Sequence, residues 1–245
     1  MKRFFETATV FEVDQKHSVA LDGKPIRTPE GSAVVLPTAT LAAEVAAEWS
    51  AQGDEIKPLT MPLTRLACTA IDKVIPVRPR VIEQIARYGQ SDLLCYRSQG
   101  PDDLVAHQAA NWQPILDWLE AHHQVPLAVT HGIVHVEQPE SSLRRLTEIV
   151  GGYEGFRLTG LAELTQLTGS LAVAIAFVDG QIAAEEVVVV SQLDDDWQAD
   201  KWGEDGEALA RRKHLEADIL AAVRFLDALA EPAINRPLDQ SPVGR

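Results

Sequence analysis

The sequence predicts an α+β protein, in which a small antiparallel β-rich N-terminal domain is followed by a mainly α-helical C-terminal domain. β-favouring side chains occupy alternate positions near the start of the chain, whereas apolar side chains recur every three or four residues over most of the remainder. The proline-bracketed stretch from Ile56 to Pro62 separates the two patterns. We therefore expect domains at residues 1–60 and 61–245.

The β unit is predicted from an alternating pattern and a turn. Asp22-Gly23 is typical of a two-residue hairpin turn, because both central positions of such a turn require positive φ. The side chains that alternate before this turn are Phe5, Thr7, Thr9, Phe11 and Val13, and Val19 and Leu21 continue the pattern.

The first helix is predicted at about residues 38–52, within the N-terminal domain. Thr38 is a typical N-cap, and the alanine-rich background after it favours a helix. Leu41, Val45 and Trp49 recur four residues apart, which gives this helix one apolar edge. Trp49 is expected to anchor the helix to the β unit through packing.

Helical spacing dominates the C-terminal domain. Pro114 is expected to kink or interrupt one of its helices. Residues 125–137 are either a short strand or a connector, and the β-favouring run 187–190 is assigned to a helix because of its flanks. The helices are predicted around residues 81–88, 104–119, 158–178, 181–196 and 215–229, of which 158–178 is expected to be one buried central helix.

Composition excludes several classes of function. With 22 basic and 36 acidic residues the formal net charge is −14, which argues against binding nucleic acid or an anionic membrane surface. The longest apolar stretch, Leu171 to Val178, is far shorter than the about 20 residues that cross a bilayer, so no membrane insertion is expected. The two cysteines, Cys68 and Cys95, form no metal or disulfide motif and fit a reducing compartment.

No catalytic motif is recognisable. The glycine-rich stretch Gly151 to Gly155 lacks the lysine that grips nucleotide phosphates, and a turn is expected there. The region from His122 to Glu137, which is rich in histidine, gives the alternative function, a metal-assisted hydrolase. On a strand, however, His131 and His135 would lie about 13 Å apart, too far to bind one ion. We therefore expect no enzyme activity, no cofactor and no metal.

The most unusual segment runs from Asp194 to Glu207. It contains seven acidic residues, opposed only by Lys201, and Trp197 and Trp202 lie among them before Gly203. Large aromatic side chains beside concentrated charge are typical of protein-recognition surfaces. One interpretation is therefore a partner-binding segment, and the other is a solvated helix end whose tryptophans pack on the helical bundle. A calcium or magnesium site is disfavoured because the EF-hand spacing is missing.

Short motifs also succeed one another along nearly the whole chain, from residue 3 to about 230. In the N-terminal part they are Arg3-Phe4-Phe5, the run Leu21-Asp22-Gly23-Lys24-Pro25-Ile26-Arg27-Thr28-Pro29, Leu36-Pro37-Thr38, Glu48-Trp49 with Ala51-Gln52-Gly53, and Met61-Pro62-Leu63-Thr64-Arg65. Later ones are Asp92-Leu93-Leu94-Cys95-Tyr96-Arg97, Trp112 with Pro114-Ile115 and Asp117-Trp118, and Ser191 with Leu193-Asp194-Asp195-Asp196-Trp197-Gln198 and Lys201-Trp202-Gly203. Single motifs of this kind are weak, but this many in one order are specific. The chain resembles the ATP-twelve chaperones, the assembly factors for the alpha subunit of the ATP synthase catalytic sector.

The resemblance implies a non-enzymatic chaperone that binds the unassembled alpha subunit and masks the surface that a beta subunit later occupies. It also implies an important acidic residue just after Trp202-Gly203, which maps to Glu207, with Asp205 and Glu204 as alternatives. The expected partner-binding residues are Glu207, Asp205, Glu204, Trp202 and Trp197, and the expected structural or family-motif residues are Trp49, Asp22, Gly23, Arg65 and Gly203.

The same resemblance suggests where and in what form the protein acts. The mitochondrial members carry an import leader that is not recognisable here, so a bacterial form acting in the cytoplasm is expected. A chaperone that substitutes for a neighbouring subunit is expected to be a monomer.

Overall fold

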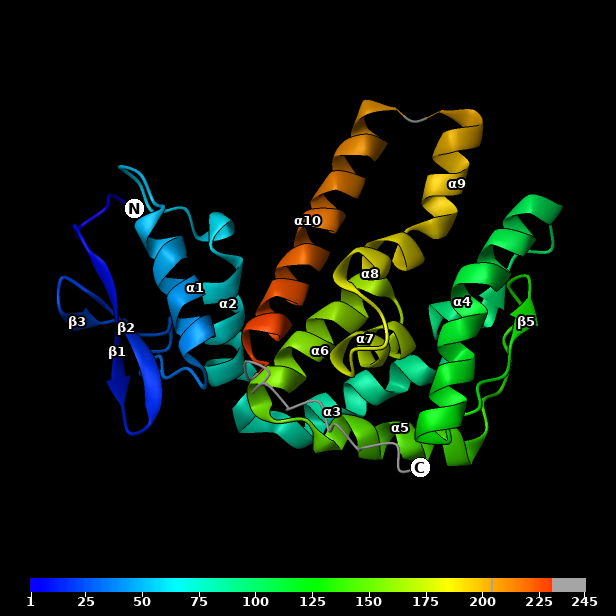
Figure 1. The fold of residues 1–245 in the computed structure, drawn as a ribbon, viewed down its shortest axis with the longest axis horizontal. Helices are drawn as coiled ribbons and strands as arrows, with labels where there is room; N and C mark the ends of the chain where they lie inside the picture. The colour runs from blue at the N-terminus through cyan, green and yellow to red at the C-terminus, as the bar shows by residue number, and fades with distance from the viewer. Residues whose placement is uncertain (204, 231–245) are drawn as a thin grey trace, which may run out of the picture.

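The structure, a computed structural model, describes residues 1–203 and 205–230 of the 245-residue chain. Three N-terminal strands form an antiparallel sheet, and helices make up most of the chain after them, so the predicted α+β class is confirmed. Figure 1 shows the sheet at one end of the molecule and α4 with β5 at the other. None of the described helices has both the length and the apolar composition that a bilayer crossing needs.

The strands are β1 (Ala8–Val13), β2 (Lys16–Leu21), β3 (Lys24–Pro25), β4 (Tyr96–Arg97) and β5 (Thr130–His131). The α-helices are α1 (Ala39–Ser50), α2 (Pro62–Thr69), α3 (Arg78–Ala86), α4 (Asp102–His123), α5 (Glu140–Gly152), α6 (Gly155–Thr168), α7 (Leu171–Val178), α8 (Ala184–Ser191), α9 (Leu193–Trp202) and α10 (Gly206–Ala228). A π-helical turn, Ala70–Val74, continues α2.

Two tight turns build the N-terminal sheet, whose strand order is β1-β2-β3. The predicted turn is confirmed, because Asp22 and Gly23 have φ values of 47° and 77° and join β2 to β3. The turn between β1 and β2 was not predicted, and it places Asp14 and Gln15 at φ values of 48° and 60°. Glutamine rarely adopts this left-handed conformation, so the sequence carried no strong signal for the second turn.

The helix expected at residues 38–52 forms as α1 and packs on this sheet. Thr38 is its N-cap, because the Thr38 hydroxyl oxygen accepts a hydrogen bond from the Leu41 N–H at 3.1 Å. The same hydroxyl donates to the Ala228 carbonyl at 2.6 Å, which ties the start of α1 to the end of α10. Leu41 and Val45 are buried, as their spacing predicted.

The N-terminal core extends beyond the sheet and α1. Leu63 and Leu66 of α2 belong to the same buried cluster, and so do Phe225 and Leu229 at the end of α10. The last helix within the described residues therefore completes the core of the first part of the chain. The division at residue 60 stays a prediction, and the N-terminal cluster reaches through α2.

The helical part has its own core, with α6 and α7 in the middle of it. The prediction of one helix over residues 158–178 was wrong, because Gly169 adopts a φ of 68° and ends α6. Ser170 then caps α7, its hydroxyl oxygen accepting from the Val173 N–H at 3.0 Å. A glycine in the left-handed conformation followed by a serine cap is a standard way to end one helix and begin another.

Three ambiguous regions are resolved. The β-favouring valines lie in helix α8, as predicted, but the single helix predicted around residues 181–196 was wrong, because Gln192 separates α8 from α9. Pro114 lies inside α4, which continues through it as one helix rather than being interrupted. Within residues 125–137, only Thr130–His131 forms a strand, which pairs in parallel with β4.

Candidate partner-binding surface

Helix α9 and the first half of α10 extend away from the rest of the helical part and meet at a tip (Figure 1, top). The base of α9 is fixed, because Leu193 is buried. Gly203 ends α9 with a φ of 79°, and Asp205 caps α10 by accepting a hydrogen bond from the Ala208 N–H at 2.8 Å. The described part of the tryptophan-bearing acidic segment singled out in the sequence runs from the base of α9 to this tip and into the first turn of α10.

The two tryptophans of the tip have different environments. Their rings meet edge to face with centroids 5.5 Å apart. Trp197 is half-buried against the helical core, and its Nε1 donates to Asp103 of α4 at 3.4 Å. Trp202 is 74% exposed, so it is the tryptophan of this pair that a partner can reach.

Lys201 helps to hold Trp197 in place. Its Nζ lies 2.7 Å from the Asp103 carboxylate and 5.4 Å from the centroid of the Trp197 ring. The hydrogen bond from this ammonium group lowers the pKa of Asp103 below its usual value. Lys201, the only basic residue among the acids of the segment, is therefore already in an ion pair with α4.

Several acids of the segment make contacts that stabilise the tip. Asp194 accepts a hydrogen bond from Gln108 Nε2 at 2.7 Å, which joins α9 to α4. Asp196 forms an ion pair with Arg212 at 2.9 Å, which joins α9 to α10. Together with the Asp205 cap, these contacts give part of the acidic cluster a structural role.

Glu207 is more accessible to a partner than the acids that make these structural contacts. Its side chain is 86% exposed, and its ion pair with Arg211 on the next helical turn is long, at 3.7 Å. Pairs of this kind contribute only about 0.3–0.5 kcal/mol. The third candidate, Glu204, lies outside the described residues.

A cleft of about 350 Å³ separates α9 from α10. Trp202 and Asp205 lie at its tip end, and Arg211 and Arg212 line its α10 side. Both signs of charge and an exposed aromatic ring therefore meet in one small cleft, an arrangement suited to binding a polypeptide surface.

The remaining family-motif residues lie in the N-terminal part. The Asp22 carboxylate accepts hydrogen bonds from the Thr7 N–H at 2.9 Å and the Glu6 N–H at 3.1 Å, which locks the start of β1 to the hairpin turn. Trp49 packs edge to face on the Phe5 ring at 5.7 Å, in keeping with the expected anchor. Arg65 is exposed on α2.

Trp49 and Arg65 nevertheless share a location that sequence reasoning missed. Both line a groove of about 560 Å³ in the N-terminal part, and neither lines the α9–α10 cleft. The sequence did contain a signal for this groove. Four of its lining residues, Ile26, Trp49, Met61 and Arg65, belong to the short motifs of the N-terminal part of the sequence.

The histidines of the alternative hydrolase site are not brought together. His123 Nε2 lies 2.8 Å from Asp179, His131 Nδ1 is 3.4 Å from the Ser98 carbonyl oxygen, and His135 Nδ1 is 3.2 Å from the Tyr96 hydroxyl. Over residues 1–203 and 205–230, no group of three histidine, cysteine or acidic side chains is placed to hold a metal ion.

Comparisons with known proteins agree on one family. The family model described as ATP12 chaperone protein matches residues 2–120. The mitochondrial protein atp12 of Schizosaccharomyces pombe is 21% identical over an alignment of 215 residues, and the match covers 82% of this chain and 74% of that protein.

Solved structures extend the similarity over almost the full length. The crystal structure of Atp12 from Paracoccus denitrificans is 37% identical, with a TM-score of 0.88, and the match covers 94% of this chain and 98% of that one. The Atu1473 protein of Agrobacterium tumefaciens, a candidate chaperone, is 38% identical with a TM-score of 0.88 over 94% of this chain and 86% of its own. The chain therefore belongs to the ATP12 chaperone family and is a chaperone of ATP synthase assembly rather than an enzyme.

Proposed function

We propose that this chaperone binds the unassembled alpha subunit of the ATP synthase catalytic sector and masks its beta-contacting surface until assembly. The alpha subunit is the partner that the family resemblance implies. An unassembled subunit exposes the apolar surface meant for its neighbour, and such surfaces aggregate. A chaperone that covers this surface would keep the subunit competent for assembly.

The observation that best supports a contact at the α9–α10 tip is the exposure of Trp202 beside Glu207. Trp202 is 74% exposed and the Glu207 side chain is 86% exposed, and both lie where α9 and α10 meet. Tryptophan is enriched among the residues that dominate binding energy, because one ring buries a large area with few rotatable bonds. Glu207 would orient the partner and increase the association rate.

Glu204 and Asp205 are proposed to assist Glu207, and Trp197 to support the exposed ring of Trp202. The Trp197 indole is held by Asp103, so Trp202 packs on a fixed neighbour. A rigid contact residue loses little conformational entropy on binding.

Release requires no nucleotide hydrolysis in this proposal. The chaperone and the beta subunit would compete for the same surface of alpha, and beta would displace the chaperone. An interface of standard size, about 1,600 Å², is sufficient for such reversible masking. The protein is proposed to act as a monomer in the bacterial cytoplasm.

Co-purification tests the proposal. The tagged chaperone is incubated separately with purified alpha subunit, purified beta subunit and the assembled catalytic sector. We expect retention of alpha alone. Equal retention of all three would contradict masking, and suppression of aggregation of unrelated proteins would indicate a general holdase instead.

A further inference from the structure

A groove in the N-terminal part is not used by the proposed contact at the α9–α10 tip. It has a volume of about 560 Å³ and lies between the loop after β3, the end of α1 and one face of α2. Its size falls within the about 300–1,000 Å³ typical of binding pockets. The lining residues that carry the argument are Ile26, Trp49, Ile56, Met61, Arg65 and Cys68.

The floor of this N-terminal groove is apolar. Ile26, Ile56 and Met61 are 6%, 5% and 2% exposed, so they present a small, well-packed apolar surface. Methionine adapts its shape to different side chains, which suits a site for a polypeptide. Trp49 adds an aromatic ring, and its buried Nε1 has no hydrogen-bond partner among the described residues.

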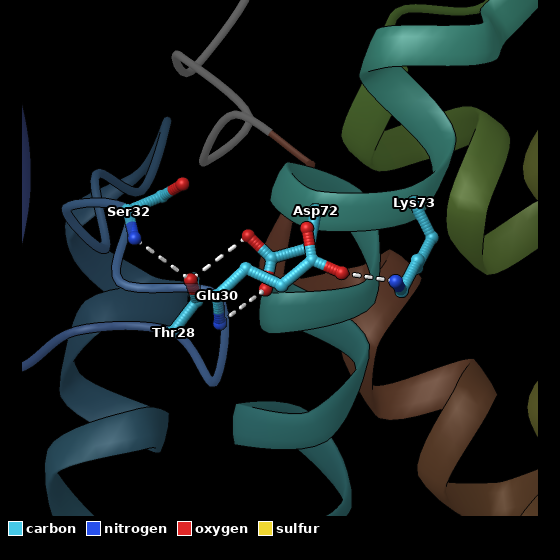
Figure 2. Close-up of polar contacts among 5 residues, drawn as sticks. All are labelled: Thr28, Glu30, Ser32, Asp72 and Lys73. Atoms are coloured by element: carbon cyan, nitrogen blue, oxygen red, sulfur yellow. Dashed lines mark hydrogen bonds and ion pairs between the residues drawn. The ribbon is translucent and has the colours of Figure 1, made fainter.

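One rim of the groove is fixed before anything binds. The Thr28 hydroxyl donates to the Asp72 carboxylate at 2.8 Å, and the Glu30 N–H donates to the same carboxylate at 3.3 Å. Glu30 also pairs with Lys73. Figure 2 shows these contacts bridging the loop of Thr28 and Glu30 and the helical turn of Asp72 and Lys73. A preformed rim reduces the entropy lost on binding.

These contacts also determine which charged side chains of the groove remain accessible to a ligand. Glu30 and Lys73 form an ion pair, so their charges offset each other, whereas the Asp72 carboxylate accepts its hydrogen bonds from the neutral Thr28 hydroxyl and Glu30 N–H. Arg27 uses its Nη1 to reach the Gly31 carbonyl at 2.7 Å, which leaves its other N–H groups available.

Arg65 supplies a second guanidinium. It is exposed on α2 and lines the groove. With Lys73 paired to Glu30, Arg27 and Arg65 outnumber Asp72 in the lining, so the groove carries net positive charge in a chain whose net charge is −14.

We infer that this groove binds an extended segment of the client protein that carries aliphatic side chains beside a carboxylate. The apolar floor takes the aliphatic side chains, and Arg27 or Arg65 pairs with the carboxylate. This inference rests on the proposed function for the identity of the client, but its chemistry can be tested without that client.

Short peptides test the chemistry directly. Three fluorescent, acetylated octapeptides are titrated with the full chain: one with leucines flanking an aspartate, one with lysine in place of the aspartate, and one with serines in place of the leucines. We expect the aspartate peptide to bind at least about tenfold more tightly than either of the others, because a like charge or the loss of aliphatic groups opposes binding. Equal binding of all three peptides would overturn the inference.

A charge reversal locates the binding. Arg65→Glu is expected to weaken binding of the aspartate peptide and to improve binding of the lysine peptide. Arg144→Glu, the same change at an exposed arginine of α5, is the matched control and should alter neither. If both variants behave alike, the groove is not the site.

Alkylation of Cys68 reports whether the alpha subunit itself occupies the groove. Cys68 is half-buried in the groove, whereas Cys95 is fully buried and serves as the internal control. Burial raises the pKa of Cys68 to about 11, so alkylation is followed by mass spectrometry at mildly alkaline pH. We expect the alpha subunit to protect Cys68.

The two proposals fail in different ways. If alpha binds but neither protects Cys68 nor loses affinity for Arg65→Glu, the groove inference is wrong and the proposed function stands. If the aspartate peptide binds through Arg65 while alpha does not bind at all, the groove is a peptide site and the proposed client is wrong.

Discussion

Trp197 and Trp202 are in edge-to-face contact, with their centroids 5.5 Å apart, yet only Trp202 is largely exposed. Trp197 is held by Asp103 of α4 and packs on the helical core. The pair therefore separates into a supporting ring and an accessible ring. The acidic residues around them divide in the same way: Asp194, Asp196 and Asp205 make structural contacts, whereas Glu207 is largely exposed.

Alanine substitutions should separate these two roles. Trp202→Ala is expected to weaken alpha binding while changing the free energy of unfolding by less than about 0.5 kcal/mol, because the ring is exposed. Trp197→Ala is expected to cost about 2 kcal/mol of stability, less than a fully buried tryptophan would. Denaturant unfolding and a binding titration measure both effects. A large loss of stability for Trp202→Ala would assign that ring to structure.

Glu207 and Asp205 should also behave differently. Glu207→Lys is expected to weaken alpha binding with a nearly unchanged thermal midpoint, because its ion pair with Arg211 is long and exposed. Asp205→Ala removes the N-cap of α10 and is expected to lower stability by about 1 kcal/mol. Differential scanning fluorimetry beside a pull-down distinguishes them, and a collapsed fold for Glu207→Lys would contradict its role in binding.

Asp22 predicts acid sensitivity of the N-terminal sheet. Hydrogen bonds from the Thr7 and Glu6 N–H groups lower the pKa of the Asp22 carboxyl. Because the pKa is lower in the folded than in the unfolded chain, the ionised carboxylate stabilises the fold. This stabilisation is complete above the unfolded pKa of about 3.9 and is lost as the pH falls through the folded pKa.

Asp22→Asn is therefore expected to reduce stability near neutral pH and to flatten its decline below about pH 4. Asparagine tolerates positive φ, so the turn itself should persist. Asp14→Asn changes the other turn of the sheet and is the matched control. The readout is the thermal midpoint of each variant between neutral and acidic pH. Parallel pH profiles for Asp22→Asn and the unchanged protein would refute the role of the carboxylate.

The buried Asp92 should be critical for the helical part. It is 0% exposed and accepts from the Ser170 hydroxyl at 2.6 Å, the Ala172 N–H at 2.9 Å and the Leu94 N–H at 3.1 Å. Burial raises the pKa of this carboxyl even though these hydrogen bonds oppose the shift. Asp92→Ala leaves three buried donors without an acceptor, and about 2–4 kcal/mol of stability should be lost.

Asp92→Asn keeps one acceptor oxygen and should lose less than Asp92→Ala. Urea unfolding of the two variants gives the comparison. Equal losses would mean that packing, rather than hydrogen bonding, dominates at this position.

Local signals predicted much of the fold. Asp22-Gly23 and the Thr38 cap act on their immediate neighbours, so their conformations could be predicted from a few residues. The Asp14-Gln15 turn could not, because glutamine has little preference for positive φ. The break at Gly169 was missed because the apolar residues on both sides are buried in one core.

The candidate partner-binding surface remains a prediction, and the sequence indicated only its outline. Aromatic and acidic residues within one segment pointed to a recognition surface, but the roles of individual acids depend on distant partners. Asp194 is bound by Gln108, 86 positions away, and the groove rim depends on a hydrogen bond between Thr28 and Asp72, 44 positions apart. No local pattern in a single sequence encodes such pairs.

Displacement by the beta subunit tests the central claim most directly. The chaperone is mixed with unassembled alpha subunit, beta is titrated in, and the species are weighed by size-exclusion chromatography with light scattering. We predict a one-to-one complex of chaperone and alpha, from which beta releases the chaperone as it binds alpha. A stable complex containing all three proteins would contradict the claim that the chaperone and beta occupy the same surface.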